Sequence, residues 1–91
     1  MRKLFIMNRA EIVSEIFALI KRFLPEYEGG DDESISFTAA GVDSLTTVDL
    51  IVASESTFGV EIPDSELPKL TTVSDLADYV IEHEGDESGA A

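Results

Sequence analysis

The chain has 91 residues, no cysteine and a formal net charge of −13 at pH 7. This length provides one small domain with a single core, which is less than most enzymes need. Without cysteine the chain has no disulfide and no thiolate metal site, so any thiol chemistry must come from a cofactor. No apolar run in the sequence approaches the length that spans a bilayer, and we expect a cytoplasmic protein.

The charge is distributed unevenly. Five of the six basic residues lie in the first 22 positions beside two acids, whereas Lys69 is the single basic residue among the 17 acids that follow. An acidic surface repels nucleic acid and anionic membranes, so we expect neither as a partner. Basic protein partners would be attracted to it. The alternative is that the acidity only keeps a small domain soluble.

The first predicted helix covers residues 10–24, where apolar residues recur at helical spacing. Asn8 can cap its start, and Pro25 ends it because proline disfavours helical geometry in the preceding residue. Residues 1–8 are predicted to be a disordered leader, since the apolar run at 4–7 is too short for a signal peptide. We place the folded domain at residues 9–84 and a disordered tail at 85–91.

Residues 26–41 form a long acidic connection of a length that often serves function or mobility. Ile35 and Phe37 alternate with polar residues, which predicts that these two side chains pin the connection to the core. The sequence that begins at Asp31 does not match the motif of a calcium-binding loop, because Val42 occupies the position of the final glutamate ligand. We therefore expect no metal site here.

The second main helix is predicted at residues 45–58, directly after Asp43 and Ser44. Both residue types are favoured helix N-caps. The preceding small residues make a flexible loop, so the Ser44 hydroxyl is expected at a helix N-terminus in contact with water. Such a hydroxyl is well placed to carry a phosphate, because the helix dipole and the free N–H groups favour an anion.

This helix has two apolar faces at a rotation of about 100° per residue. The predicted core face consists of Thr47, Leu50, Ile51, Ser54 and Phe58. The nearly opposite side carries Leu45, Val48 and Val52, flanked by Asp49, Glu55 and Ser56. An exposed apolar strip edged with acids is typical of a partner site. The alternative is that both faces are buried.

The sequence of the last third of the chain predicts one short turn and one helix. Gly59 ends the preceding helix, residues 60–63 are extended, and Asp64 caps a turn at 65–67 that Pro68 ends. The last helix runs over residues 73–82. Its predicted core face consists of Val73, Leu76, Ala77, Val80 and Ile81. His83, the only histidine, is expected to be a solvated residue at the fraying helix end.

Four segments together resemble the acyl carrier protein family: GVDSL at 41–45, TVDL at 47–50, FGVEIP at 58–63 and LTTV at 70–73. The resemblance extends over residues 11–82. It implies that Ser44 is esterified with 4′-phosphopantetheine from coenzyme A, whose terminal thiol carries an acyl chain as a thioester. It also implies that Asp43 assists the attachment by helping to hold metal and phosphate.

The same resemblance implies the partners and the cargo site. The partners are a phosphopantetheinyl transferase and ketosynthase, acyltransferase and related biosynthetic enzymes, which have basic docking patches. The docking residues it implies are Leu45, Val48, Asp49, Val52 and Glu55. The acyl pocket is expected at Leu50, Ser54 and Phe58.

The role of the Ser54 hydroxyl has two possible interpretations. Its hydroxyl can bond back to the Leu50 carbonyl, which is frequent for serine inside helices. Alternatively, it makes the acyl pocket polar and suits an oxygenated polyketide chain. Reduced acidity in the second half of the helix also inclines the pathway towards polyketide rather than fatty-acid synthesis.

Other functions fit less well. A peptidyl or D-alanyl carrier and an unmodified acidic docking module stay open as alternatives. A serine hydrolase of the Gly-Asp-Ser-Leu type is disfavoured, because Val42 interrupts that motif and Val80 stands where an aspartate should precede His83. A carrier has no catalysis of its own, so we do not expect an enzyme.

The fold expected from these elements is all-α. It is a small, mostly antiparallel bundle of three main helices and one short helix, with a long first loop and a right-handed turn. The core includes Ile16, Ile20, Leu50, Phe58, Leu76 and Val80. A monomer is expected, since no second uncommitted apolar face remains.

Overall fold

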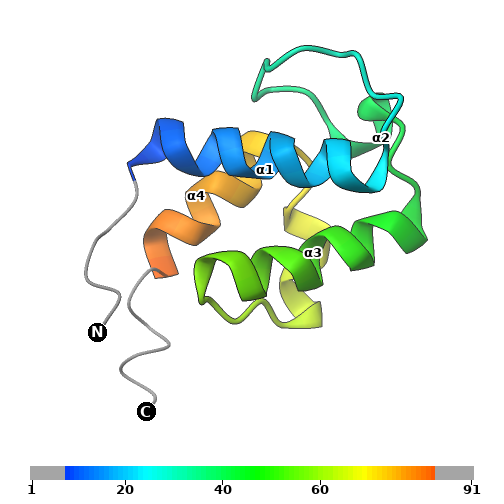
Figure 1. The fold of residues 1–91 in the computed structure, drawn as a ribbon. Coiled ribbons are helices and arrows are strands. Elements are labelled where there is room, and N and C mark those ends of the chain that lie inside the picture. The colour runs from blue at the N-terminus through cyan, green and yellow to red at the C-terminus, as the bar shows by residue number, and fades with distance from the viewer. Residues whose placement is uncertain (1–7, 84–91) are drawn as a thin grey trace.

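The computed structural model describes residues 8–83, and the predicted tail and the leader before Asn8 lie outside this range. The elements are α1 (Arg9–Phe23), α2 (Phe37–Ala40), α3 (Ser44–Phe58), the 3₁₀ helix η1 (Asp64–Lys69) and α4 (Val73–His83) (Figure 1). Over residues 8–83 the only β-type pairing is an isolated bridge between Ser36 and Thr72. The all-α prediction is confirmed. No helix within this range is long and apolar enough to cross a membrane.

Local capping explains why α1 begins and ends near the predicted residues. The Asn8 side chain accepts a hydrogen bond from the Glu11 N–H at 2.9 Å, and the Asn8 N–H donates to the Glu11 carboxylate at 2.9 Å. This reciprocal arrangement satisfies two N–H groups that a helix start otherwise leaves unpaired. At the other end the Leu24 N–H donates to the Ile20 carbonyl, and Pro25 follows outside the helix.

The short helix α2 lies in a stretch that the sequence predicts as loop. The Ser36 hydroxyl accepts a hydrogen bond from the Ala39 N–H at 3.0 Å and so caps its start. Gly41 ends it in a left-handed conformation with φ of 95°, which glycine adopts at low cost. Four residues are too few for a periodic apolar pattern, which is why the sequence does not predict α2.

The prediction for η1 is partly wrong. Asp64 is its first residue and does not cap it, because Pro63 occupies the cap position without a side-chain hydrogen bond. Pro68 lies inside the helix, which continues to Lys69. The helix tolerates this proline because its described hydrogen bonds, from Glu66 to Pro63 and from Leu70 to Leu67, do not require an N–H at residue 68.

The second half of the long loop is fastened to the start of α4. The Glu33 carbonyl accepts from the Ser74 N–H at 2.7 Å, and the Ile35 carbonyl accepts from the Val73 N–H at 3.2 Å. Phe37 is buried, and Ile35 packs against the core. The prediction that these two side chains pin the loop is confirmed.

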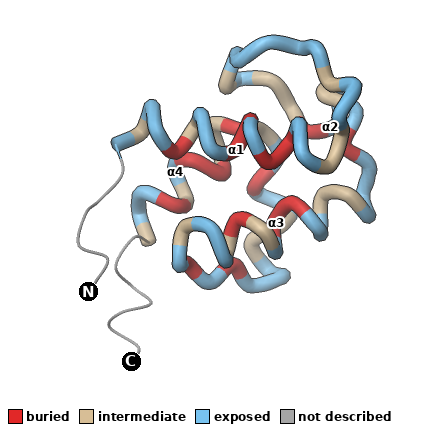
Figure 2. The backbone as a smooth tube through the Cα atoms, in the orientation of Figure 1, coloured by how far each residue is buried: buried red, intermediate tan, exposed pale blue. Residues whose placement is uncertain are grey.

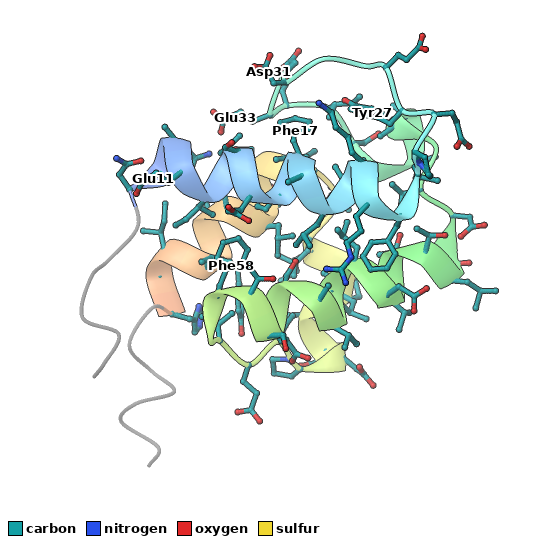
Figure 3. All side chains as sticks on the ribbon, in the orientation of Figure 1. Glu11, Phe17, Tyr27, Asp31, Glu33 and Phe58 are labelled. Carbon is teal, nitrogen blue, oxygen red and sulfur yellow. The ribbon has the colours of Figure 1, made fainter. Side chains whose placement is uncertain are left out.

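Arg9 reinforces the same attachment. Its guanidinium is paired with the carboxylates of Glu33 and Asp78 and donates to the Ser74 hydroxyl at 2.8 Å. The hydrogen bond to Glu33 is the main reason that the pKa of Arg9 is raised. The side chain therefore connects α1, the loop and α4, while Asp31 and Glu33 lie on the loop that passes over α1 (Figure 3).

The core lies where α1 packs against α3 and α4 (Figure 2). Five of the six predicted core residues are buried: Ile16, Ile20, Leu50, Leu76 and Val80. Phe58 is half-buried and packs against the core from its edge. Ile81 was expected on the core face of α4 but is 40% exposed. At about 100° per residue, Ile81 lies at the edge of the face that the buried residues of α4 form, which accounts for the difference.

Candidate functional site

Ser44 is the first residue of α3 and is exposed. Its hydroxyl makes no hydrogen bond to any other residue within 8–83, and α3 has no acidic residue in its first turn. The oxygen is therefore free to react, and an anion attached to it would lie at the positive end of the helix dipole.

The chain from α2 to α3 holds Ser44 on the surface. Gly41 turns the backbone out of α2, and Val42 then inserts into the core with only 4% of its surface exposed. The Val42 N–H donates to the Phe37 carbonyl at 2.9 Å, which fixes this turn. With Val42 anchored inside, the next two residues project towards solvent.

Asp43 is the N-cap of α3. Its carboxylate accepts a hydrogen bond from the Thr46 N–H at 2.8 Å, and its carbonyl accepts from the Thr47 N–H and hydroxyl, each at 2.8 Å. The hydrogen bond from Thr46 lowers the pKa of the Asp43 carboxyl below its ordinary value. This group is therefore an exposed carboxylate next to the Ser44 hydroxyl at neutral pH, which suits a role in holding a cation beside a phosphate.

These residues fit a 4′-phosphopantetheine group. The phosphoester bond to the arm requires one accessible hydroxyl, and Ser44 supplies it. The phosphate is stabilised by positive potential, which the N-terminus of α3 provides. The group, when bound, contributes a thiol that forms thioesters. The cysteine-free chain contains no such group.

Three apolar residues and one acidic residue on the outer side of α3 form an exposed strip, which we define as Leu45, Val48, Asp49 and Val52. Leu45 is 79% exposed, Val48 49% and Val52 57%, and Asp49 is exposed beside them. The alternative in which both faces of this helix are buried is wrong.

Glu55 differs from the other residues expected to dock partners. It is half-buried, and its carboxylate accepts a hydrogen bond from the Ile62 N–H at 2.7 Å. The side chain thus ties the end of α3 to the segment that leads into η1. Sequence reasoning missed this contact, because the partner is a backbone group whose position depends on the whole α3–η1 connection.

The inner face of α3 is tightly filled. Leu50 and Ser54 are fully buried, and the Ser54 hydroxyl donates to the Leu50 carbonyl at 2.8 Å. This is the simpler of the two readings of Ser54. Neither of the two surface pockets described for residues 8–83 is lined by Leu50, Ser54 or Phe58.

His83 is not the solvated residue that we expected. It is half-buried, its ring stacks on Tyr79 with centroids 3.9 Å apart, and its Nδ1 lies 2.9 Å from the Tyr79 carbonyl. It ends α4, at the opposite end of the molecule from the start of α3 (Figure 1). Within residues 8–83, the structure shows no serine–histidine hydrogen bond of the kind that hydrolysis needs.

Within the part of the chain that the structure describes, no group of three or more His, Asp or Glu side chains is arranged to hold a metal ion. Two acidic side chains of the long loop make other contacts: the Asp32 carboxylate accepts from the N–H and hydroxyl of Ser34 at 2.9 and 2.7 Å, and Glu33 pairs with Arg9.

Comparison with known proteins identifies the family. The family described as the phosphopantetheine attachment site matches residues 14–80. The fold is similar to the crystal structure of an acyl carrier protein from Thermotoga maritima, with a TM-score of 0.74 and 28% sequence identity. The alignment covers 85% of this chain and 91% of that protein. The chain therefore belongs to the acyl carrier protein family, whose covalent cofactor is 4′-phosphopantetheine.

Proposed function

We propose that this protein carries acyl intermediates as thioesters on a 4′-phosphopantetheine arm attached to Ser44. The observation that carries the proposal is the exposed, unbonded hydroxyl of Ser44 at the start of α3, within the region that matches the attachment-site family. In the attachment, Ser44 Oγ forms the new bond to phosphorus. The adenosine bisphosphate part of coenzyme A leaves, and the serine proton passes to a base of the transferase.

Asp43 assists this step. Its lowered pKa keeps the carboxylate ionised, so that it can bind the cation that neutralises the phosphate during transfer. Its hydrogen bond to the Thr46 N–H fixes the first turn of α3 and with it the position of Ser44.

The family implies contact with a transferase and with biosynthetic enzymes. We propose that the exposed strip of α3 is the docking surface, that Asp49 pairs with basic residues of ketosynthases and acyltransferases, and that Glu55 contributes a weaker share. An exposed apolar strip beside acidic groups offers both desolvation energy and orientation to such partners. We further propose that the protein acts in the cytoplasm as a monomer and catalyses no reaction itself.

The pathway is proposed to be polyketide or fatty-acid synthesis. A polar pocket at Ser54 would favour polyketide chains, but the Ser54 hydroxyl donates to the Leu50 carbonyl and is not free to bind a chain. A peptidyl or D-alanyl carrier and an unmodified docking module are the alternatives.

The test is to incubate the protein with coenzyme A, Mg²⁺ and a broad-specificity phosphopantetheinyl transferase, and to measure the intact mass. We expect one arm on the wild-type protein and none on Ser44→Ala. If the transferase modifies a control carrier but not this protein, the carrier function is rejected and the unmodified docking module becomes the better explanation.

A further inference from the structure

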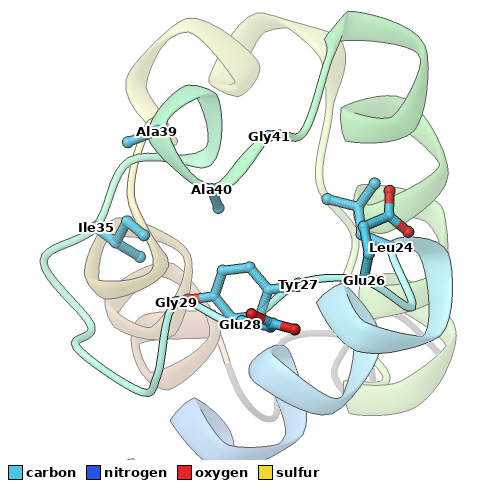
Figure 4. Close-up of a pocket in the computed structure, with 9 residues that line it drawn as sticks. All are labelled: Leu24, Glu26, Tyr27, Glu28, Gly29, Ile35, Ala39, Ala40 and Gly41. Carbon is cyan, nitrogen blue, oxygen red and sulfur yellow. The ribbon is translucent and has the colours of Figure 1, made fainter.

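A pocket of about 280 Å³ lies between the end of α1, the long loop and α2 (Figure 4). Its apolar lining consists of Leu24, Tyr27, Ile35, Ala39 and Ala40, with Gly41 at its edge. We propose that this pocket holds a short, uncharged acyl group carried on the Ser44 arm. The proposal rests on the proposed function and adds where the cargo lies and which cargo is accepted.

The aromatic wall of the pocket is fixed in place. The Tyr27 ring stacks on Phe17 with centroids 6.2 Å apart and an angle of 19°, and its hydroxyl donates to the Gly30 carbonyl at 3.0 Å. A Cβ placed on Gly29 would approach the Tyr27 ring to 2.6 Å, so the backbone lies directly against the ring. These contacts hold the ring before any ligand arrives, which reduces the entropy lost on binding.

Small residues keep the opposite side of the pocket open. Ala39 and Ala40 present only methyl groups, and a Cβ placed on Gly41 would meet just one atom within 4 Å, the Leu24 Cδ1 at 3.9 Å. The volume is close to the lower limit of about 300 Å³ for small-molecule pockets, which suits a short chain. A larger side chain at residue 40 would therefore fill space that the acyl group needs.

The pocket is within reach of the attachment site. Gly41 precedes Ser44 by three residues, which separates their Cα atoms by at most about 11 Å. The arm contains two amide units in series and is longer than that. The thioester can therefore lie at the pocket while the phosphate stays at the N-terminus of α3.

The rim selects against charged cargo. Glu26 and Glu28 line the pocket and are both exposed. They repel an acyl group that ends in a carboxylate, such as a succinyl chain, and a carboxylate would also lose hydration among the apolar walls. A hexanoyl chain has neither disadvantage. The expected occupant is thus a neutral, short acyl chain.

The experiment uses the full-length protein carrying the arm with a ¹³C-labelled hexanoyl thioester, with loading verified by intact mass. We expect nuclear Overhauser contacts from the acyl methyl and methylenes to the Tyr27 ring and the Ile35 methyl groups. Contacts to Leu50 and Phe58 without any to Tyr27 or Ile35 would overturn the proposal and place the cargo on the inner face of α3.

Two variants sharpen the result. Ala40→Leu is expected to abolish the contacts to Tyr27, whereas the matched Ala18→Leu, an exposed position on α1 away from this pocket, retains them. A succinyl thioester should show no contacts in the wild-type protein and should gain them when Glu26→Gln and Glu28→Gln are combined. If hexanoyl and succinyl chains give the same contacts, the selection by charge is rejected.

The two proposals fail in different ways. Failure to gain the mass of the arm contradicts the carrier function. A loaded protein without contacts to the pocket leaves the carrier function intact and contradicts only the location of the cargo.

Discussion

Helices α3 and α4 both have a side-chain cap at the N-terminus, but only the N-terminus of α4 is hydrogen-bonded to a neighbouring loop. In α4 the first three N–H groups all have partners: Val73 donates to the Ile35 carbonyl, Ser74 to the Glu33 carbonyl and Asp75 to the Thr72 hydroxyl. In α3 the Asp43 carboxylate takes the Thr46 N–H, and no loop in the described chain is hydrogen-bonded across Ser44. The fold closes one helix start and leaves the other accessible.

The difference comes from the long loop rather than from the helices. Residues 33–36 run beside the start of α4 and supply carbonyl groups to it, while the segment from α2 leads directly into α3 and cannot turn back over its start. A closed helix start stabilises the fold, whereas an accessible one is available for an attached phosphate. Substitutions at the two starts should therefore separate stability from attachment.

The largest effect on stability is expected from Asp75→Ala. The Asp75 carboxylate is half-buried and accepts from the N–H and hydroxyl of Thr71, both at 3.0 Å, and from the Thr72 N–H at 3.1 Å. Its removal leaves the partly buried Thr72 N–H without this acceptor and also removes both hydrogen bonds from the exposed Thr71, so the free energy of unfolding should fall by about 1–3 kcal/mol. Urea unfolding measures this change. Arm attachment to the folded variant should be unchanged, and a loss of attachment in the folded protein would show that the two helix starts are coupled.

The next effect is expected at Asp43, the cap of the accessible helix. Asp43→Ala should lower the free energy of unfolding by about 1 kcal/mol, as is typical for loss of an N-cap. Asp43→Asn is the matched control, because asparagine caps helices as well as aspartate does. It should retain the cap and most of the stability while slowing arm attachment, since the negative charge is lost. Equal attachment rates for Asp43→Asn and the wild type would contradict the proposal that the charge of Asp43 assists the attachment.

A smaller and graded effect is expected with pH. Burial raises the pKa of Asp75, but the hydrogen bonds from Thr71 and Thr72 outweigh it and leave the pKa below its ordinary value; the pKa of Asp43 is also lowered. Because the folded-state pKa is lower than the unfolded value of about 3.9, each carboxylate stabilises the fold above that pH. This stabilisation is lost as the pH falls below about 4 through the folded-state pKa.

Urea midpoints between pH 6 and pH 2 measure this loss. The decline should be shallower for Asp75→Asn, which has no proton to take up at that position. A decline as steep as that of the wild type would show that other carboxylates dominate the acid sensitivity.

The sequence predicted those features that depend on residues close together in the chain. The spacing of apolar residues within α3 correctly placed Leu45, Val48 and Val52 on the face opposite the buried Leu50. The capping residues Asp43 and Gly59 indicated where this helix begins and ends. These features follow from helical periodicity and capping, which act over a few residues.

The features that the sequence did not predict depend on contacts between distant segments. The Glu55 carboxylate accepts a hydrogen bond from the Ile62 N–H, and the Arg9 guanidinium joins Glu33 to Asp78. Likewise, the pocket beside Tyr27 exists only because the loop folds back over α1. Periodicity carries no information about where such loops return.

The smallest effect on stability is expected from Ser44→Ala, even though it should abolish arm attachment. The hydroxyl is exposed and unbonded in the described chain, so the free energy of unfolding should change by no more than about 0.5 kcal/mol. Thr72→Ala at the closed helix start is the matched control, because the Thr72 hydroxyl accepts from the Asp75 N–H and its loss should cost about 1 kcal/mol. Urea unfolding of both variants tests the comparison. If Ser44→Ala were as destabilised as Thr72→Ala, the Ser44 hydroxyl would have a structural role, and the start of α3 could not be regarded as kept accessible for the arm.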